Sequence, residues 1–374
     1  MAGIYIHIPF CRTKCRYCDF FSETGRFSSG HFISMLLEEA QTRVDFFKGE
    51  IPGTLYFGGG TPSVLNASQI RNIITGLNTV FDFRKMAEIT IEVNPDDLNE
   101  CYVGEIKSMG FNRISIGFQS VYDEFLRFLG RRHNMVQAFE AVDMAGKAGF
   151  ENISIDLIYG IPGLTNSMWK DTLLRVMDTG VQHISAYHLT YEEGTPLHKA
   201  LYEERFFEVA EEQSFEQFCL LCEILSKNGF EHYEISNFAR SGFRSLHNSA
   251  YWLQEKYLGL GPSAHSYNGI IREWNPSSLK EYEKMVCHGS AREAERLNDR
   301  DHFNEFVMTR LRTDTGIPID QLEKISGKFR ASKLMQAVEK YIRSGHIHFN
   351  NKHITLSVEG MFISDTIISD LMLL

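Results

Sequence analysis

Three cysteines near the start of the chain are spaced as ligands of a metal cluster. Cys11, Cys15 and Cys18 form a C-x3-C-x2-C pattern directly after an apolar run at residues 4–8. Thiolates select zinc, copper(I) or iron-sulfur clusters. A closed zinc site usually has four protein ligands, and no second ligand pair lies close enough in the sequence to complete one. Three thiolates instead suit a 4Fe-4S cluster whose fourth iron is left open.

Glycines and polar side chains follow later apolar runs, where they could meet a ligand. Residues 58–61, Gly-Gly-Gly-Thr, come after the run at 54–57, and Glu92 lies near the end of the run at 88–93. Glycines let backbone amides approach a ligand, and a carboxylate has two acceptor oxygens that suit a ribose diol. Taken alone, the glycines could form a tight turn and Glu92 could be a surface charge. The next turns and strands add Gln119, Arg131 and Asp156.

A second group of candidate ligands lies at residues 247–252, His-Asn-Ser-Ala-Tyr-Trp. A histidine nitrogen can bind heme iron, and Tyr251 and Trp252 offer apolar faces with polar tips that suit a porphyrin. A histidine among aromatic residues is, on composition alone, more often part of the packing. The residues themselves leave both interpretations open.

Alternating β and α patterns predict the elements that position these residues. Six strands are expected, at residues 4–8, 54–57, 88–93, 113–117, 153–158 and 183–188. The predicted helices cover residues 30–47, 67–81, a stretch ending at 109, 121–129, 136–148, 166–178 and 204–227. Repeated β-α units require a parallel sheet, either open or closed as a partial barrel. In both, ligands bind at the carboxyl ends of the strands, where the candidate residues lie.

The pattern changes from about residue 275. Helices are predicted at 301–312, 319–325 and 333–344, followed by a hairpin at 347–356 with an Asn-rich turn. We therefore divide the chain into residues 1–270 and a smaller winged-helix-like unit at 271–374. Such units often bind DNA, but this one lacks a basic recognition helix. The role we predict for it is therefore to cover the mouth of the barrel or to dock a partner protein.

Composition narrows the class of protein. The 374 residues carry a net charge of −10, which argues against nucleic-acid binding but says nothing against weak, local membrane contact. No stretch approaches the ~20 apolar residues of a membrane span, and no signal peptide is recognisable, so a cytoplasmic protein is expected. Seven cysteines without a paired pattern fit a reducing compartment, and Cys219 and Cys222 read as part of an amphipathic core helix.

The stretch at residues 8–20 resembles the cluster loop of the radical S-adenosylmethionine (SAM) superfamily. Within it, the chain is similar to the branch that contains the coproporphyrinogen III dehydrogenase HemN and the heme chaperone HemW. The resemblance implies a partial (β/α)6 TIM-like barrel and a 4Fe-4S cluster whose open iron is chelated by SAM. It also implies an electron donor for the cluster, and cleavage of SAM into methionine and a 5′-deoxyadenosyl radical.

The resemblance carries over to individual positions. Those that match contacts to the cluster-bound SAM are Tyr5, Gly59 and Glu92. Those that match a second SAM position of the branch, or that shape a single SAM pocket, are Tyr17, Gly60, Thr61, Gln119, Arg131 and Asp156. Those that resemble the H-N-x-x-Y-W motif associated with heme binding in the HemW branch are His247, Asn248, Tyr251 and Trp252.

One departure from the dehydrogenase pattern favours a chaperone. The dehydrogenases resemble C-x3-C-x2-C-x-C, and Phe20 occupies the position of the last cysteine. The expected function is to bind heme and deliver it to acceptor hemoproteins such as those of the respiratory chain. The alternatives are an oxygen-independent coproporphyrinogen III oxidase, which decarboxylates two propionates, and another radical SAM enzyme. Whether SAM is cleaved and whether the chain forms a homodimer are left open.

Overall fold

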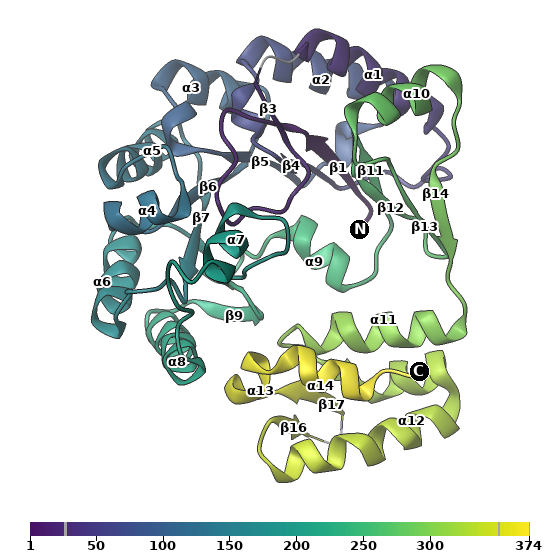
Figure 1. Ribbon diagram of the computed structural model, residues 1–374. Coiled ribbons are helices and arrows are strands. Elements are labelled where there is room, and N and C mark those ends of the chain that lie inside the picture. The colour runs from purple at the N-terminus through teal and green to yellow at the C-terminus, as the bar shows by residue number, and fades with distance from the viewer. Residues whose placement is uncertain (26–27, 351, 374) are drawn as a thin grey trace.

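A twelve-stranded sheet organises the larger part of the molecule (Figure 1). The structure is a computed structural model that describes residues 1–25, 28–350 and 352–373. The six predicted strands lie side by side in chain order, and each pairs in parallel with the next. They are β1 (Gly3–Ile8), β4 (Thr54–Gly59), β5 (Glu88–Val93), β6 (Arg113–Gln119), β7 (Asn152–Tyr159) and β8 (His183–His188). The predicted α/β class, with a parallel core and a helical C-terminal unit, is confirmed.

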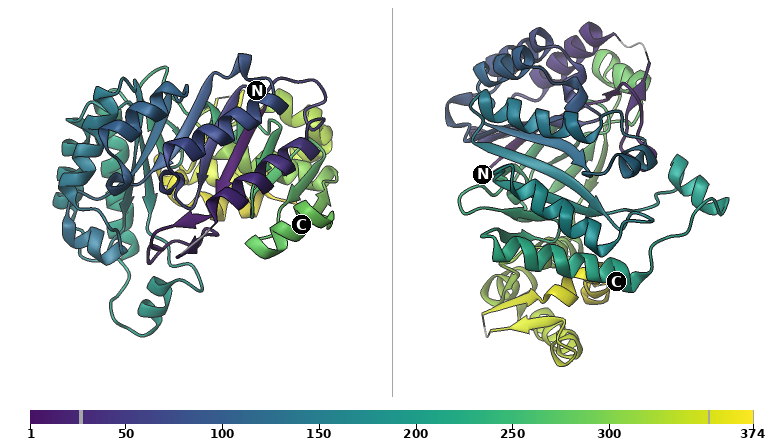
Figure 2. Two further views of the ribbon diagram at one scale, coloured as in Figure 1. Left: turned by 90° about the horizontal axis from the view of Figure 1, so that it is seen from above. Right: turned by 90° about the vertical axis from the view of Figure 1, so that its left-hand side faces the viewer.

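Helices connect these strands and cover the outer face of the sheet (Figures 1 and 2). They are α1 (Ser29–Thr42), α2 (Ala67–Val80), α3 (Glu100–Ser108), α4 (Asp123–Leu129), α5 (Met135–Lys147), α6 (Asn166–Met177) and α8 (Glu211–Lys227). Alternate strand side chains such as Ile4, Ile6 and Ile8 lie on one face of the sheet and are fully buried, as expected where helices cover that face. Cys222 of α8 packs into this core, as predicted, and Cys219 is partly exposed.

The long helix predicted at 204–227 is wrong in its first part. A separate helix, α7 (Pro196–Tyr202), precedes it, and α8 begins only at Glu211. Thr195 caps α7, and Glu204 has a left-handed backbone with φ of 53° that no helix can include. Similarly, α1 ends at Thr42, and turns replace the rest of the helix predicted to reach residue 47. The segment with α7 projects from the body of the molecule (Figure 2).

Short strands that the sequence pattern did not indicate extend the sheet at both edges. Beyond β8 lie β10 (Asn237–Ala239) and β9 (Glu231–Glu234), both antiparallel. Beyond β1 lie β11 (Tyr257–Leu260), β12 (His265–Tyr267), β13 (Ile271–Trp274) and β14 (Glu293–Arg296). A short helix, α9 (Leu246–Trp252), links the two extensions, and α10 (Leu279–His288) joins β13 to β14. Helix α9 carries the whole H-N-x-x-Y-W segment.

A second hydrophobic core, with buried residues from Phe303 to Leu371, defines the C-terminal unit. Its elements are α11 (Asp299–Leu311), β15 (Ile317–Pro318), α12 (Ile319–Arg343), β16 (Ile347–Phe349), β17 (His353–Leu356), α13 (Val358–Phe362) and α14 (Ser364–Leu371). The two helices predicted at 319–325 and 333–344 form one element, α12, that is interrupted at Gly327. The predicted hairpin is present, but Asn351 in its turn lies outside the described residues.

The boundary at residue 270 stays a prediction, although β13 and β14 beyond it pair with the large sheet.

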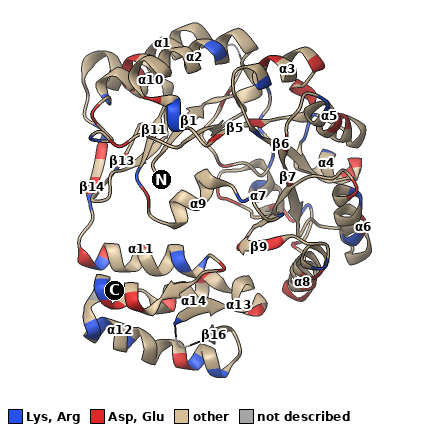
Figure 3. Cartoon of the chain, turned by 180° about the vertical axis from the view of Figure 1, so that it is seen from behind, with Lys and Arg blue, Asp and Glu red and all other residues tan. Residues whose placement is uncertain are grey.

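Acidic and basic residues are interspersed along the outer helices (Figure 3). Among the described residues, no helix combines the length and the apolar character that crossing a bilayer would require.

Candidate functional site

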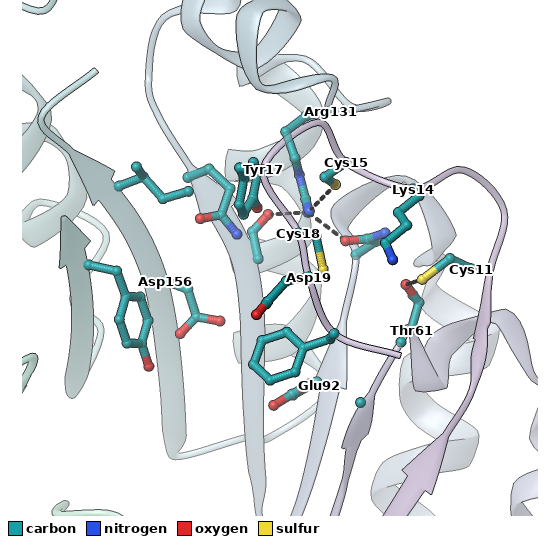
Figure 4. A pocket seen from close by; sticks show the side chains of 18 of the residues that line it. Cys11, Lys14, Cys15, Tyr17, Cys18, Asp19, Thr61, Glu92, Arg131 and Asp156 are labelled. Carbon is teal, nitrogen blue, oxygen red and sulfur yellow. Dashed lines mark hydrogen bonds between the residues drawn. The ribbon is translucent and has the colours of Figure 1, made fainter. Parts of the chain in front are cut away.

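The three cysteines lie on the loop after β1, at a cavity of about 600 Å³ (Figure 4). The loop contains the short strand β2 (Phe10–Cys11), which pairs with β3 (Glu23–Thr24). The cavity opens at the carboxyl ends of the parallel strands, where the sequence placed it. The predicted residues that line it are Cys11, Cys15, Tyr17, Cys18, Gly59, Gly60, Thr61, Glu92, Gln119, Arg131 and Asp156. Tyr5 does not line this cavity; its ring packs behind it against Tyr56.

Hydrogen-bonding groups of different kinds surround the cysteine sulfurs. Cys11 Sγ lies 3.2 Å from the Thr61 hydroxyl, and Cys15 Sγ accepts a hydrogen bond of 3.3 Å from the Arg131 guanidinium. Among the described side chains, no three His, Cys, Asp or Glu residues converge as closely as a single metal ion requires. A four-iron cluster needs less convergence, because each thiolate binds a different iron. The donor set therefore fits such a cluster.

The glycine segment after β4 packs directly onto the cluster loop. The Gly60 amide donates to the Ile8 carbonyl and the Thr61 amide to the Phe10 carbonyl, both at 2.8 Å. A Cβ atom on Gly60 would lie only 2.8 Å from the Phe10 oxygen. The segment continues into η1 (Pro62–Val64). These glycines therefore hold the loop against the sheet, a packing role that the sequence alone did not separate from ligand binding.

Two partly buried carboxyl groups, Glu92 of β5 and Asp156 of β7, face the cavity (Figure 4). Burial raises the pKa of Glu92 to about 7, although a hydrogen bond of 2.6 Å from the Tyr56 hydroxyl opposes the shift. Burial also raises the pKa of Asp156, whose carboxylate accepts a hydrogen bond of 3.2 Å from Ser115. The side-chain hydrogen-bond partners described for these two carboxyl groups are hydroxyls. Both groups can therefore accept hydrogen bonds from the hydroxyls of a ligand or balance its positive charge.

Gln119 and Arg131 also line this cavity. Gln119 is buried at the end of β6 with φ of 66°, an uncommon conformation that costs about 1–3 kcal/mol and often occurs at functional sites. Arg131 follows Gly130, which ends α4 in a left-handed conformation. Its guanidinium donates to Asn94 Oδ1 at 2.5 Å and to the Gly117 carbonyl at 2.8 Å, in addition to Cys15.

A second cavity of about 600 Å³ lies between α9, the added strands and α11 of the C-terminal unit. Asn248, Tyr251 and Trp252 of the H-N-x-x-Y-W segment line it. The other lining residues are Tyr187, Glu234, Ser236, Asn237, Gln254, Tyr257, Tyr267, Arg272, Glu305, Met308, Thr309 and Arg312. Three buried polar atoms from this set have no partner: Asn237 Oδ1, Trp252 Nε1 and Arg272 Nε. Unpartnered buried groups of this kind call for an explanation, and hydrogen bonds to a ligand or to water in the cavity would supply one.

His247 lies behind Tyr251, outside the wall of the second cavity. Its Nδ1 is 2.8 Å from the Thr54 hydroxyl and its Nε2 is 2.9 Å from the Tyr251 hydroxyl, so both ring nitrogens are engaged. Burial lowers the pKa of His247 to about 3, which keeps the ring neutral. The ring also stacks on Tyr56 at 5.0 Å, and Tyr56 in turn donates to Glu92.

The two cavities are neighbours, because Tyr187 and Ser236 belong to the walls of both. Tyr187 extends from the end of β8, and Ser236 lies in the turn between β9 and β10. A ligand in one cavity would therefore lie next to a side chain that also contacts the other.

Sequence reasoning missed the residue that holds α9 in place. The buried Glu88 carboxylate accepts hydrogen bonds from the backbone amides of Leu246 at 2.8 Å and His247 at 3.0 Å. These amides belong to the first turn of α9, where a negative charge is also favoured by the helix dipole. The sequence did contain one signal for this role, because Glu88 is a charged residue at the start of the apolar run 88–93. The cavity residues of α11 gave no comparable signal, because their partners lie far away in the sequence.

Comparison with known proteins gives consistent matches over the whole chain. Residues 5–176 match the model of the radical SAM superfamily, and residues 297–363 match that of the HemN C-terminal domain. The chain is 36% identical to the heme chaperone HemW of Lactococcus lactis, over 88% of this chain and 85% of that protein. It is 30% identical to the heme chaperone HemW of Mycobacterium tuberculosis, over 99% and 94% of the two chains.

A solved structure shows the same fold. The structure of coproporphyrinogen III oxidase (HemN) from Escherichia coli superposes with a TM-score of 0.86, covering 99% of this chain and 89% of that chain, at 23% identity.

Proposed function

The chain belongs to the HemW family of the radical SAM superfamily, and from this membership we propose that it is a heme chaperone. It would bind heme and deliver it to acceptor hemoproteins, including those of the respiratory chain. The observation that carries the proposal is the second cavity, whose wall contains Asn248, Tyr251 and Trp252 of the H-N-x-x-Y-W segment and three unpartnered buried polar atoms. Phe20, at the position where the dehydrogenases have a cysteine, is 65% exposed beside the first cavity and supports the same choice.

Membership in the superfamily implies a 4Fe-4S cluster and SAM, and the first cavity has residues for both. Cys11, Cys15 and Cys18 would hold the cluster. Glu92 would accept hydrogen bonds from the ribose of SAM, and Asp156 would face the same space. A reduced cluster held there would supply an electron for the cleavage of SAM. Tyr5 would act indirectly, because its ring supports Tyr56, which donates to Glu92.

The second cavity has the groups that a heme requires. Its aromatic walls, among them Tyr251, Tyr257 and Trp252, can pack against a porphyrin face. Arg272 and Arg312 could bind the two propionates with the guanidinium nitrogens that do not pair with Glu305 and Asp365, because a guanidinium can donate hydrogen bonds to more than one carboxylate. The unpartnered Nε of Arg272 is available for such a bond.

We propose that His247 becomes an iron ligand only after Tyr251 moves. The Tyr251 hydroxyl occupies His247 Nε2, and the ring is already neutral, as a ligand must be. Until that movement occurs, the cavity would hold heme by its aromatic and polar walls alone.

An anaerobic heme titration of the cluster-reconstituted protein, followed by Soret absorbance, tests the function. A saturable complex near one heme per chain is expected, with no decarboxylation when coproporphyrinogen III is offered with SAM and reductant. Trp252→Phe removes the unpartnered Nε1 donor together with part of the indole surface, and it should weaken heme binding about three- to tenfold. Trp274→Phe is the matched control, because Trp274 bonds Glu293 outside the cavity. Equal effects of the two substitutions, or no saturable binding, would contradict the proposal.

Four further predictions concern partners of the chain: the acceptor hemoproteins, an electron donor for the cluster, a second copy of the chain in a homodimer, and weak contact with a membrane. A pull-down with holo-protein followed by heme transfer to an apo-cytochrome would address the first of them.

A further inference from the structure

Arg131 occupies a position from which it can act on the cluster itself. Of the three cysteine sulfurs, Cys15 Sγ is the one that accepts a hydrogen bond from a charged group, the Arg131 guanidinium, at 3.3 Å. The nearest described donor to Cys11 Sγ is the neutral Thr61 hydroxyl at 3.2 Å. The sulfurs of Cys15 and Cys11 therefore differ in the charge of their hydrogen-bond partners.

The guanidinium is fixed on several sides. It donates to Asn94 and to the Gly117 carbonyl, and a Cβ atom on Gly117 would lie only 2.8 Å from its terminal nitrogen. The turn that carries it also packs on the cluster loop, because the Arg16 amide donates to the Leu129 carbonyl at 3.0 Å. Arg131 and Cys15 are thus held together by backbone contacts that do not depend on a bound SAM.

We propose that Arg131, through its hydrogen bond to Cys15 Sγ, raises the reduction potential of the cluster. Reduction adds a negative charge, which spreads over the cysteine sulfurs, and hydrogen bonds to those sulfurs are one of the factors that set cluster potentials. A buried cation stabilises the more negative state more strongly than it would in water. The inference rests on the proposed binding of the cluster by the three cysteines, and it is independent of heme.

The effect is separate from any contact between Arg131 and SAM. A SAM contact would change SAM affinity, whereas a hydrogen bond to the sulfur changes the potential in the absence of SAM. The measurement is therefore an anaerobic redox titration of reconstituted protein without SAM, followed by EPR of the reduced cluster. Iron and sulfide content are determined on the same samples.

Arg131→Met removes the charge and the donor together. We expect the one-electron reduction equilibrium to fall about tenfold, which corresponds to about 59 mV toward more negative potential. Arg131→Lys keeps the charge and should shift the potential less. Lys14→Gln is the matched control, because it removes a positive charge from the wall of the same cavity, and Lys14 makes no described hydrogen bond to a cysteine sulfur.

An unchanged potential in Arg131→Met with full iron and sulfide content would overturn the inference. An equal shift in Lys14→Gln would also overturn it, because net charge would then explain the effect without the hydrogen bond. If Arg131→Met cannot hold the cluster, Asn94→Ala provides the test, since it loosens the guanidinium without removing it. It should shift the potential in the same direction by a smaller factor, and no shift would refute the proposal. Cysteine variants that keep full iron and sulfide content after reconstitution would instead contradict the proposed cluster site.

Discussion

Removing the carboxylate of Glu88 should release the N-terminus of α9. The carboxylate accepts two backbone hydrogen bonds, from Leu246 and His247, and lies 3.4 Å from the Ser245 hydroxyl. In Glu88→Ala, two buried amides lose a charged acceptor, and each such bond contributes about 1.5–3 kcal/mol. We therefore expect local opening of α9 to become easier by about 3–6 kcal/mol.

Hydrogen exchange followed by mass spectrometry measures this local opening directly. Because 1.4 kcal/mol corresponds to a factor of ten, protection of the α9 amides should fall at least about 100-fold in Glu88→Ala. Glu88→Gln keeps one acceptor oxygen and should show roughly half of this free-energy change. Heme binding should weaken with it, since α9 carries Asn248, Tyr251 and Trp252.

Glu50→Ala is the matched control for this experiment. Glu50 also pairs with a residue just after α9, Lys256, at 3.0 Å, but both side chains are 39% exposed. Exposed ion pairs contribute about 0–1 kcal/mol, so protection of α9 should change little. If Glu88→Ala leaves exchange in α9 unchanged, the carboxylate does not hold the helix and the reasoning fails.

Three further predictions concern the first cavity and its neighbours. The pKa of Glu92 is raised to about 7, so its carboxylate forms as the pH rises through 7. The affinity for SAM, measured by equilibrium dialysis, should therefore increase from pH 6 to pH 8. In Glu92→Gln, the affinity should not change over this range. Gly60→Ala should displace the cluster loop and lower iron content on reconstitution, because the new Cβ meets the Phe10 oxygen; Gly30→Ala, where a Cβ meets no atom within 4 Å, should leave it unchanged. His247→Ala should weaken heme binding while iron and sulfide content stay full; unchanged heme affinity would remove His247 as a ligand.

The sequence predicted the parallel core well because its signals are local. The apolar runs that became β1, β4 and β5 are each bounded by turn residues, and the polar residues at their ends meet in one cavity, as strand geometry requires. The Cys11, Cys15 and Cys18 spacing likewise depends on one short loop.

What the sequence could not show depends on partners distant in the chain. Strands such as β10 and β12 have three residues each and take their conformation from the neighbouring strands, so no periodicity marks them. The second cavity combines Trp252 of α9 with Arg312 just after α11, a pairing that no local pattern contains. For the same reason, the position of His247 behind Tyr251 followed only from the structure.

The salt bridge of 2.8 Å between Arg272 of β13 and Glu305 of α11 joins the large sheet to the C-terminal unit across the second cavity. Neither position can change charge alone without leaving its partner half-buried and unpaired. Among related sequences, these two positions should therefore vary together. If the C-terminal unit were replaced by that of another protein, the residue at position 272 would have to change to match its new partner.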